Sequence, residues 1–305
     1  MSNYTNNLFD PETKNNSWVH LFEFVPEKTR VLDIGCSSGN FGHVLINEKH
    51  CEVVGLDIDA PDIAEARKKL TAAYVRNIER EEIKDLGMFD VIVFADVLEH
   101  LLDPIAALEK AKKQLKKGGR IVFSIPNMAH ISIRIQLMKG FFEYMPIGVL
   151  DRTHLHYYDE IEVKHIFSEA KMAIQEINPA TLSYPESKVS EELYHLGLGI
   201  VDQAKLNEIL EDTKSNVWQF VGYALPVAQK IPIDRKIKYR SPPEELQITL
   251  EARDQELKLI GKRLRELEAE NRHMSEFYHN PVKGGLKRAA RRVRALQDKR
   301  AKPSK

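Results

Sequence analysis

The sequence has little cysteine, no net charge and no long hydrophobic run, and each absence narrows the class of protein. Cys36 and Cys51 are the only two cysteines among 305 residues, which excludes a disulfide framework and favours a reducing compartment. Lys and Arg together number 45, as do Asp and Glu, so no overall charge attracts nucleic acid or an anionic membrane. No apolar run approaches the roughly 20 residues that span a bilayer, and the polar segment MSNYTNNLFDPETKNN lacks the features of a signal peptide. We therefore expect a cytoplasmic protein.

Short apolar runs alternate with amphipathic stretches between residues 29 and 228. The runs are rich in β-branched residues and bounded by Gly, Asp or Pro, as buried strands are. The predicted strands are residues 30–34, 53–57, 90–95, 120–125, 173–178 and 217–225. The predicted helices are residues 41–49, 63–70, 105–117, 191–195 and 203–210, and we expect Gly118 and Gly119 to end the third of them. This alternation predicts an α/β protein with a doubly wound, mostly parallel sheet.

The composition changes after residue 228. Prolines stand among charged residues in 229–244, which predicts a linker. In 245–278 apolar residues recur at heptad positions a and d, and only Arg253 and Asn271 interrupt that series. We therefore expect a coiled coil that joins two chains in a homodimer. A single amphipathic helix packed on the globular domain is the alternative.

The last segment, 279–305, is a basic tail. From Lys283 onward ten Lys and Arg residues are opposed by the single acid Asp298. Apolar residues recur among them at helical spacing, namely Leu286, Ala289, Ala290, Val293 and Leu296. The pattern predicts peripheral contact with an anionic membrane surface, at the inner face of the membrane, and a solvated charged tail is the alternative. Because the tail has no aromatic residues on which bases could stack, we expect no nucleic-acid partner.

A glycine-rich turn joins the first predicted strand to the helix that follows it, in the segment VLDIGCSSGN at 31–40. Its Gly-x-x-x-Gly spacing differs from the Gly-x-Gly-x-x-Gly cradle that binds a pyrophosphate. Asp33, two residues before the first glycine, offers a carboxylate to a cationic amino-acid or sulfonium ligand. Asp57 ends the second predicted strand, where an acid can accept both hydroxyls of a ribose.

Five segments follow one another along the chain: VLDIGCSSGNFG, VVGLDID, FDVIVFADVLEHLLDP, GGRIVFSIPN and LDRTHLHYYD. In this order they resemble the class I S-adenosylmethionine-dependent methyltransferases, and most of all the small-molecule branch found among polysaccharide-biosynthesis enzymes. The resemblance covers residues 1–228 and implies a Rossmann-like sheet of seven strands whose last strand is antiparallel. It also implies S-adenosylmethionine as the cofactor.

The resemblance further implies which residues contact that cofactor. Gly35, Ser37 and Gly39 are expected to line its methionine part together with Asp33. Asn77 stands where the family offers an acid to the adenine amine, and an amide oxygen can accept that hydrogen bond without charge assistance. The full set of expected contacts is Asp33, Gly35, Ser37, Gly39, Asp57, Asn77, Ile78, Ala95 and Asp96, the last two beside the sulfonium.

A hydroxyl acceptor requires removal of a proton, and His154 is the residue that we expect to act as general base. A structural role for His154 is the alternative. His154 and His156 point the same way in an extended segment, but spacing places no third ligand beside them, so we expect no metal site. We expect Asn127, Arg152 and His156 to contact the acceptor, although Asn127 can equally cap the following helix.

Two other features lie near these residues. His100 is expected to be scaffolding or part of the pocket wall. The stretch that precedes the His154 segment is rich in Met and aromatic residues, which predicts either a lid over the acceptor or core packing. Its members are Met138, Phe141, Phe142, Tyr144 and Met145.

Taken together, the motifs predict an S-adenosylmethionine-dependent methyltransferase that acts on an oxygen of a sugar or glycan precursor or of another small molecule. A second hypothesis is an interaction protein that uses the methyltransferase fold as a platform for its coiled coil. A third is an RNA methyltransferase. The Asn/Asp-Pro-Pro-aromatic motif expected for chemistry on a base amine is absent, because Asp96-Val97-Leu98-Glu99 stands in its place.

Overall fold

The computed structural model describes residues 15–198, 215–233, 257–263 and 265. Within them one seven-stranded sheet has the order β3-β2-β1-β4-β5-β7-β6. Its strands are β1 (Arg30–Ile34), β2 (Glu52–Asp57), β3 (Ala72–Val75), β4 (Phe89–Ala95), β5 (Leu115–Pro126), β6 (Met172–Thr181) and β7 (Val217–Pro226). The strands from β3 to β5 pair in parallel, whereas β7 is antiparallel to both β5 and β6. The expected doubly wound sheet with an antiparallel last strand is therefore confirmed.

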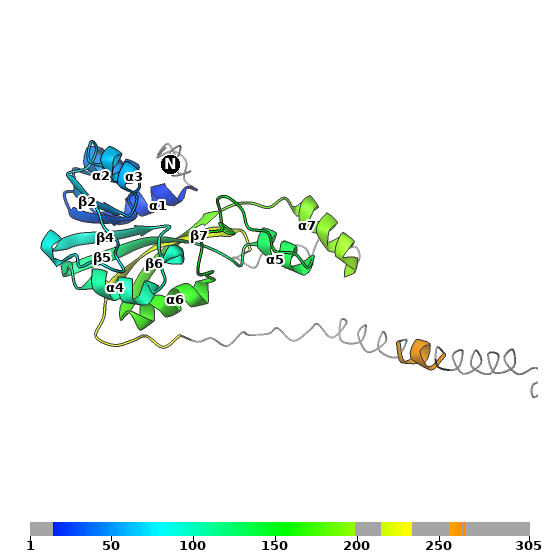
Figure 1. The fold of residues 1–305 in the computed structure, drawn as a ribbon. Coiled ribbons are helices and arrows are strands. Elements are labelled where there is room, and N and C mark those ends of the chain that lie inside the picture. Colours follow the sequence, from blue (N-terminus) through cyan, green and yellow to red (C-terminus); the bar gives the residue numbers. More distant parts are fainter. Residues whose placement is uncertain (1–14, 199–214, 234–256, 264, 266–305) are drawn as a thin grey trace, which may run out of the picture. The chain divides into compact units, whose positions relative to one another are not determined.

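Helices cover both faces of this sheet (Figure 1). The helices are α1 (Ser17–Phe24), α2 (Asn40–Lys49), α3 (Ala60–Ala66), α4 (Pro104–Lys112), α5 (Ile131–Met138), α6 (Glu160–Glu169) and α7 (Glu186–Leu193), with short turns η1 (Lys84–Leu86), η2 (Leu98–His100) and η3 (Tyr194–Leu198). Helices α1, α2 and α3 lie on one face, and α4 and α6 lie on the other. Helix α5 packs against α7 through a small apolar cluster that includes Ile131 and Val189.

Successive residues of a strand point to opposite faces, so each central strand supplies two apolar cores. On β1, Val31 packs with the cluster that contains Leu45 of α2, while Leu32 packs with the cluster that contains Leu108 of α4. A strand buried on both faces has to be apolar at nearly every position, which is why periodicity located these strands within a few residues. Asp33 is the exception on β1, because it is a buried carboxylate in an apolar strand.

Three predicted helices differ from the structure at their ends, and the one predicted at 191–195 is observed as α7 (Glu186–Leu193) followed by η3. Helix α3 begins at Ala60 rather than at 63 because the Asp59 side chain accepts a hydrogen bond from the Asp62 amide and caps it, and the helix ends at Ala66. Helix α4 ends at Lys112, and Gly118 and Gly119 lie inside β5 instead of stopping the helix. Pairing of Leu115 with Phe89 draws that segment into the sheet.

The chain divides into two compact units, residues 1–235 and 236–305. Residues 229–233, the start of the predicted linker, belong to the first unit, where the Ile231 amide donates to Ser168 Oγ at 2.8 Å. In the second unit residues 257–263 and 265 are helical, and Leu257 and Ile260 are exposed. The other residues of the predicted coiled coil and the whole basic tail lie outside the described residues, as does the predicted helix at 203–210.

No helix within the described residues is long and apolar enough to cross a membrane.

Candidate functional site

The loop between β1 and α2 has the backbone conformation that the glycine-rich turn predicts. Gly35 and Gly39 have φ values of +73° and +77°, and Ser37 between them has φ +46°. A Cβ atom added to Gly35 would lie 2.4 Å from Cγ2 of Val97, so the loop can approach β4 only with glycine here. Gly39 is also the residue that precedes the first turn of α2. The loop therefore presents backbone rather than side chains at the carboxyl ends of β1 and β4.

Asp57 is held beside this loop by two backbone hydrogen bonds. The Ser37 amide donates to Oδ2 of Asp57 at 2.8 Å, and the Asp59 amide donates to Oδ1 at 2.9 Å. The Ser37 hydroxyl donates to Oδ2 of Asp62 at 2.9 Å and fixes the loop from its other side. A carboxylate has about four acceptor positions, so Asp57 keeps capacity on both oxygens for two neighbouring hydroxyls. This geometry fits the role of ribose acceptor.

Asp33 lies one strand away and is almost fully buried, with 2% of its surface exposed. Its Oδ2 atom has no hydrogen-bond partner among the described residues. Burial and the charge of Asp57 raise the pKa of Asp33 to about 7. A cationic ligand would offset both the burial and the repulsion between the two carboxylates. The pair of acids at neighbouring strand ends therefore fits the amino-acid and sulfonium part of S-adenosylmethionine.

At the expected adenine end of the site, Asn77 bonds to its own turn. Its Oδ1 atom accepts hydrogen bonds from the amides of Glu79 and Arg80, at 2.8 and 3.3 Å. That this oxygen accepts from the adenine amine stays a prediction. Ile78 lies in the core with 5% of its surface exposed.

At the end of β4, Asp96 has a positive φ of +54° and a half-buried side chain that is held by two hydrogen bonds. Its Oδ1 accepts from the hydroxyl of Ser124 at 2.9 Å and from Nε2 of Gln219 at 2.8 Å. Burial raises the pKa of Asp96, and these two hydrogen bonds oppose the shift. Ala95 and Asp96 thus stand at the strand end next to the glycine loop, as predicted, and Asp96 is fixed from β5 and β7.

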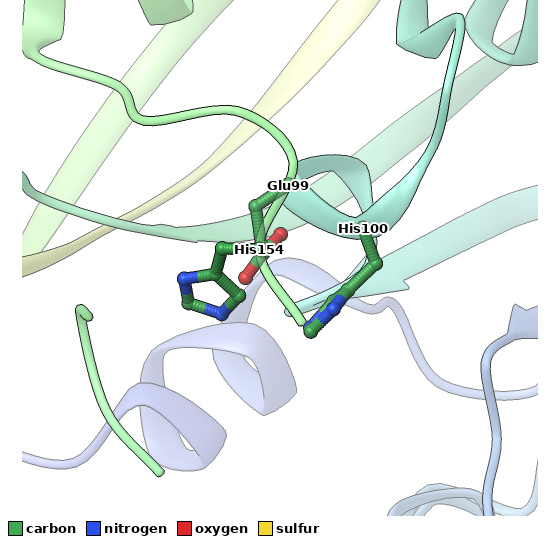
Figure 2. Close-up of side chains that lie close together, drawn as sticks. All are labelled: Glu99, His100 and His154. Carbon is green, nitrogen blue, oxygen red and sulfur yellow. The ribbon is translucent and has the colours of Figure 1, made fainter. Parts of the chain in front are cut away.

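Beyond Asp96 the chain forms η2, which carries Glu99 and His100, and His154 approaches from a separate segment before α6 (Figure 2). One atom from each of these three side chains lies within 4.8 Å of the others. The rings of His100 and His154 meet edge to face with centroids 4.7 Å apart. Two residues that are far apart in sequence from His154 therefore complete a cluster around it.

His154 is buried, and its protonation can be inferred from its partner. Its Nδ1 atom lies 2.9 Å from the carbonyl oxygen of Val149. A carbonyl can only accept, so Nδ1 carries the proton and Nε2 keeps its lone pair. Burial and the neighbouring His100 lower the pKa of His154, which keeps the ring neutral near pH 7. The predicted base therefore has the protonation state that its role requires.

Glu99 is a residue that sequence reasoning missed. Its side chain is fully buried, and neither carboxylate oxygen has a hydrogen-bond partner among the described residues. Burial, and next the charge of Asp96, raise the pKa of Glu99 well above its ordinary value. The only signal in the sequence was its place in Asp96-Val97-Leu98-Glu99-His100 directly after a predicted strand end.

The structure places the three other predicted acceptor contacts in different surroundings. Asn127 is fully buried, donates to the Val217 carbonyl at 2.8 Å and accepts from the Ala129 amide at 2.9 Å. Its amide joins β5 to β7, and His130 rather than Asn127 caps α5. The capping alternative for Asn127 is therefore wrong, and its contact with the acceptor stays a prediction. Arg152 is exposed. The ring of His156 lies beside Tyr158 at 6.1 Å and outside the cluster that contains His154.

The Met and aromatic stretch between α5 and the His154 segment is exposed. Phe142 packs edge to face on the rings of Tyr144 and Tyr157, with centroids 5.1 and 5.9 Å away. Between 40% and 51% of each side chain in the stretch remains accessible, namely in Met138, Phe141, Phe142, Tyr144 and Met145. The interpretation of this stretch as core packing is therefore wrong. The lid interpretation stays a prediction.

The chain is similar to known methyltransferases in sequence and in fold. A family model described as a methyltransferase domain matches residues 10–176. The ubiquinone biosynthesis O-methyltransferase of Pectobacterium atrosepticum is 32% identical over 104 residues, which cover 32% of this chain but only 43% of that enzyme. The enzyme of the same name from Acinetobacter baumannii is 26% identical over 170 residues, covering 51% of this chain and 70% of the relative. Among solved structures, the N-methyltransferase NodS from Bradyrhizobium japonicum has a TM-score of 0.44 and 18% identity, covering 69% of this chain and 93% of NodS.

Proposed function

Because the chain belongs to the family of methyltransferase domains and its cofactor is S-adenosylmethionine, we propose that it methylates an oxygen atom of a small molecule that carries hydroxyl groups. The observation that carries the proposal is the glycine loop bonded to Asp57 through the Ser37 amide at 2.8 Å. When bound, the cofactor supplies an electrophilic methyl group on a sulfonium. The chain's own residues then have three tasks: they hold the cofactor, place the acceptor oxygen in line and remove its proton.

We assign the first task to Asp33, Asp57 and the loop between β1 and α2. Asp57 offers acceptor capacity to two ribose hydroxyls, and Asp33 offers a buried negative charge to the cationic part of the cofactor. The site fits because Oδ2 of Asp33 is buried and has no hydrogen-bond partner among the described residues. A cation next to it would supply the interaction that these residues leave unmade.

We assign deprotonation of the acceptor to His154. Its Nδ1 is bonded to the Val149 carbonyl, which leaves the lone pair of Nε2 to accept a proton. Arg152 and His156 lie in the same segment, and we propose that they contact the acceptor from its outer side. The exposed stretch around Phe142 is proposed as the lid over that acceptor.

Two classes of acceptor molecule are each supported by a different observation. The resemblance of the five sequence motifs supports a hydroxyl of a sugar or glycan precursor. The names of the two relatives support O-methylation of a compound in ubiquinone biosynthesis. Both classes require the same chemistry, an oxygen nucleophile that loses one proton.

The test is an acceptor screen with methyl-labelled S-adenosylmethionine. The full chain is incubated separately with sugar nucleotides and glycan fractions, with dihydroxylated aromatic acids, and with RNA, and products are identified by mass spectrometry. We expect label on an oxygen of one of the first two classes. Label on RNA alone, or on nitrogen alone, would contradict the proposal.

The matched controls for the cofactor site lie on one strand. Asp57→Ala removes the proposed ribose acceptor at the carboxyl end of β2, whereas Glu52→Ala removes an exposed acid at the other end, where it pairs with Arg30. Loss of hydrogen bonds to a carboxylate costs about 1.5–3 kcal/mol, hence about ten- to hundredfold in affinity. Calorimetry should show that loss for Asp57→Ala and none for Glu52→Ala. Wild-type affinity in a folded Asp57→Ala chain would contradict the assignment.

A further inference from the structure

We propose that Glu99, His100 and His154 bind a divalent transition-metal ion such as Zn²⁺ or Mn²⁺, with an open coordination position for the acceptor oxygen. This inference rests on the proposed function and deepens it, since it concerns how the acceptor hydroxyl is bound and made acidic. The sequence had favoured no metal because spacing supplied no third ligand for His154. The fold supplies two, both from η2.

The first argument is convergence of the donor atoms. One carboxylate oxygen and one imidazole nitrogen from each histidine lie within 4.8 Å of one another (Figure 2). Ligands at about 2.0–2.2 Å from one ion stand a little over 3 Å apart, so modest side-chain movement would bring all three onto the ion. The loop that carries His154 is tied to η2, because the amides of Leu155 and His156 donate to the Glu99 carbonyl at 2.8 and 3.1 Å.

The second argument is the orientation of both imidazoles. The Thr153 hydroxyl donates to Oδ1 of Asp151 at 2.7 Å, so its proton is not directed at His100. Nδ1 of His100 therefore carries a proton, which it donates to the Thr153 carbonyl at 3.2 Å. Nδ1 of His154 likewise donates to the Val149 carbonyl at 2.9 Å. Histidines that bind metals have this arrangement, in which the outer N–H is held by a carbonyl and the other nitrogen is directed at the ion.

The third argument is the unpartnered carboxylate of Glu99. It is fully buried, and both of its oxygens lack a hydrogen-bond partner in the part of the chain that the structure describes. Asp96 and Asp151 are close enough to repel a charge on it. No ion pair found among the described residues joins any of these three acids to Lys or Arg. A buried carboxyl in such surroundings is costly unless a cation binds it.

The ligand set indicates the kind of ion. Two imidazole nitrogens and one carboxylate oxygen suit Zn²⁺, Mn²⁺ or Fe²⁺, whereas Mg²⁺ prefers an all-oxygen shell. Three protein ligands leave at least one position open, as in catalytic rather than structural sites. A hydroxyl bound there becomes more acidic by direct contact with the ion. With an ion held there, Nε2 of His154 would be a ligand rather than the base; the metal would lower the pKa of the acceptor hydroxyl, and the proton would pass to solvent water.

The test measures metal binding by the full chain without cofactor or acceptor, so it is independent of the proposed function. Chelator-stripped protein is titrated with Zn²⁺ by calorimetry and with Co²⁺ by visible absorption. We expect one ion per chain and Co²⁺ bands typical of nitrogen and oxygen ligation. Glu99→Gln and His154→Asn should weaken binding by more than about 100-fold, because loss of an outer hydrogen-bond partner alone costs about 10–100-fold.

His156→Asn is the matched control, because this histidine lies two residues from His154 and outside the cluster. It should bind the ion as wild type does. Circular dichroism of the metal-free chains reports their folding, and if Glu99→Gln does not fold, the decisive measurement is whether Zn²⁺ raises the melting temperature of stripped wild type. A stripped wild-type chain that binds neither ion, or equal loss of binding in His156→Asn, would overturn the inference. Cofactor binding by calorimetry would remain unaffected in either case.

Discussion

Asp33 is a carboxylate whose charge depends on what lies beside it. It stands in the middle of the sheet, and its Oδ2 lies close enough to α2 that a Cβ atom on Gly42 would approach it to 3.5 Å. Burial and Asp57 raise its pKa to about 7, compared with an ordinary value of about 3.9. Its ionisation is therefore coupled both to folding and to the binding of a cation.

We predict that affinity for S-adenosylmethionine rises with pH up to about 7 and then levels off. Below its raised pKa, Asp33 has to lose a proton before it can face the cationic cofactor, so affinity should fall by up to about tenfold per pH unit. In the cofactor-free chain the contribution of this group to stability is fully present below pH about 4 and is lost as pH rises through about 7. Calorimetry between pH 5 and 8 should show the slope in wild type and a flat profile in Asp33→Asn; a slope retained in that variant would assign it to another group.

His154 carries the second prediction at this scale. His154→Ala should lower turnover by about 10²–10⁴ while the affinity for cofactor stays unchanged, because its nitrogen acts on the acceptor. His43→Ala is the control, since that histidine lies on the outer surface of α2 and bonds only to Asn47 at 3.0 Å. Steady-state kinetics and calorimetry together separate the two effects. Undiminished turnover in His154→Ala would contradict a role for this side chain in deprotonation, either as the base or as a ligand of the proposed ion.

The sequence predicted individual residues well where their role depends on near neighbours. Asp57 and Ser37 lie in turns whose backbone conformation follows from the local motif. Glu99 was missed because its significance depends on His154, which only the tertiary fold brings beside it. The hydrogen bond from the Glu79 amide to the Asn77 side chain was not predictable from the motif either, because it depends on how the turn folds.

At the scale of elements, the loop between β1 and α2 is the part least tolerant of change. We predict that Gly35→Ala lowers the melting temperature and weakens cofactor binding, because the new Cβ would lie 2.4 Å from Val97. Gly118→Ala is the matched control: φ there is +81°, but no atom lies within 4 Å of an added Cβ. It should show only the backbone cost of about 1–2 kcal/mol and normal cofactor affinity. Equal effects of the two substitutions would mean that the approach to Val97 is unimportant.

Strands were predicted more closely than helices. β1 is observed at the predicted residues, since a strand buried on both faces leaves an uninterrupted apolar run. The end of α4 was not predictable from spacing, because Leu115 continues the helical pattern yet pairs with Phe89 in the sheet. Whether such a residue continues the helix or pairs with a distant strand is decided by tertiary packing. The spacing of apolar residues carries no information on that packing.

At the scale of the whole molecule, two further predictions concern the second unit. We expect residues 245–278 to join two chains in a parallel coiled coil, with Asn271 selecting two strands at some cost in stability. Sedimentation should give a dimer for the full chain and a monomer for a chain that ends at Arg235, the limit of the first unit. Asn271→Val should raise the melting temperature of the dimer and admit higher oligomers. A full chain that sediments as a monomer would favour the single-helix alternative.

The basic tail carries the last prediction. Two tails on one dimer should bind anionic vesicles, since each basic residue near such a surface contributes about 1 kcal/mol and pairing adds avidity. Flotation should recover the full chain with anionic vesicles at low salt and not with neutral ones. A chain that ends at Asn280 should not float with either. If the full chain also fails to float at low salt, the tail is a solvated segment or serves another partner.

The place of β7 in the sheet has a consequence for how the protein is made. Among the described residues β7 is the last strand to be synthesised, yet it lies between β5 and β6 and pairs with both of them. Until β7 emerges, the nascent chain exposes one edge of β5 and has no neighbour for β6. Exposed strand edges are sites of aggregation, and long-range pairing is slow. A ribosome that stalls before residue 226 therefore leaves unpaired strand edges in the sheet. Translation of β7 is the step after which those edges are paired and the methyltransferase domain is protected from aggregation through them.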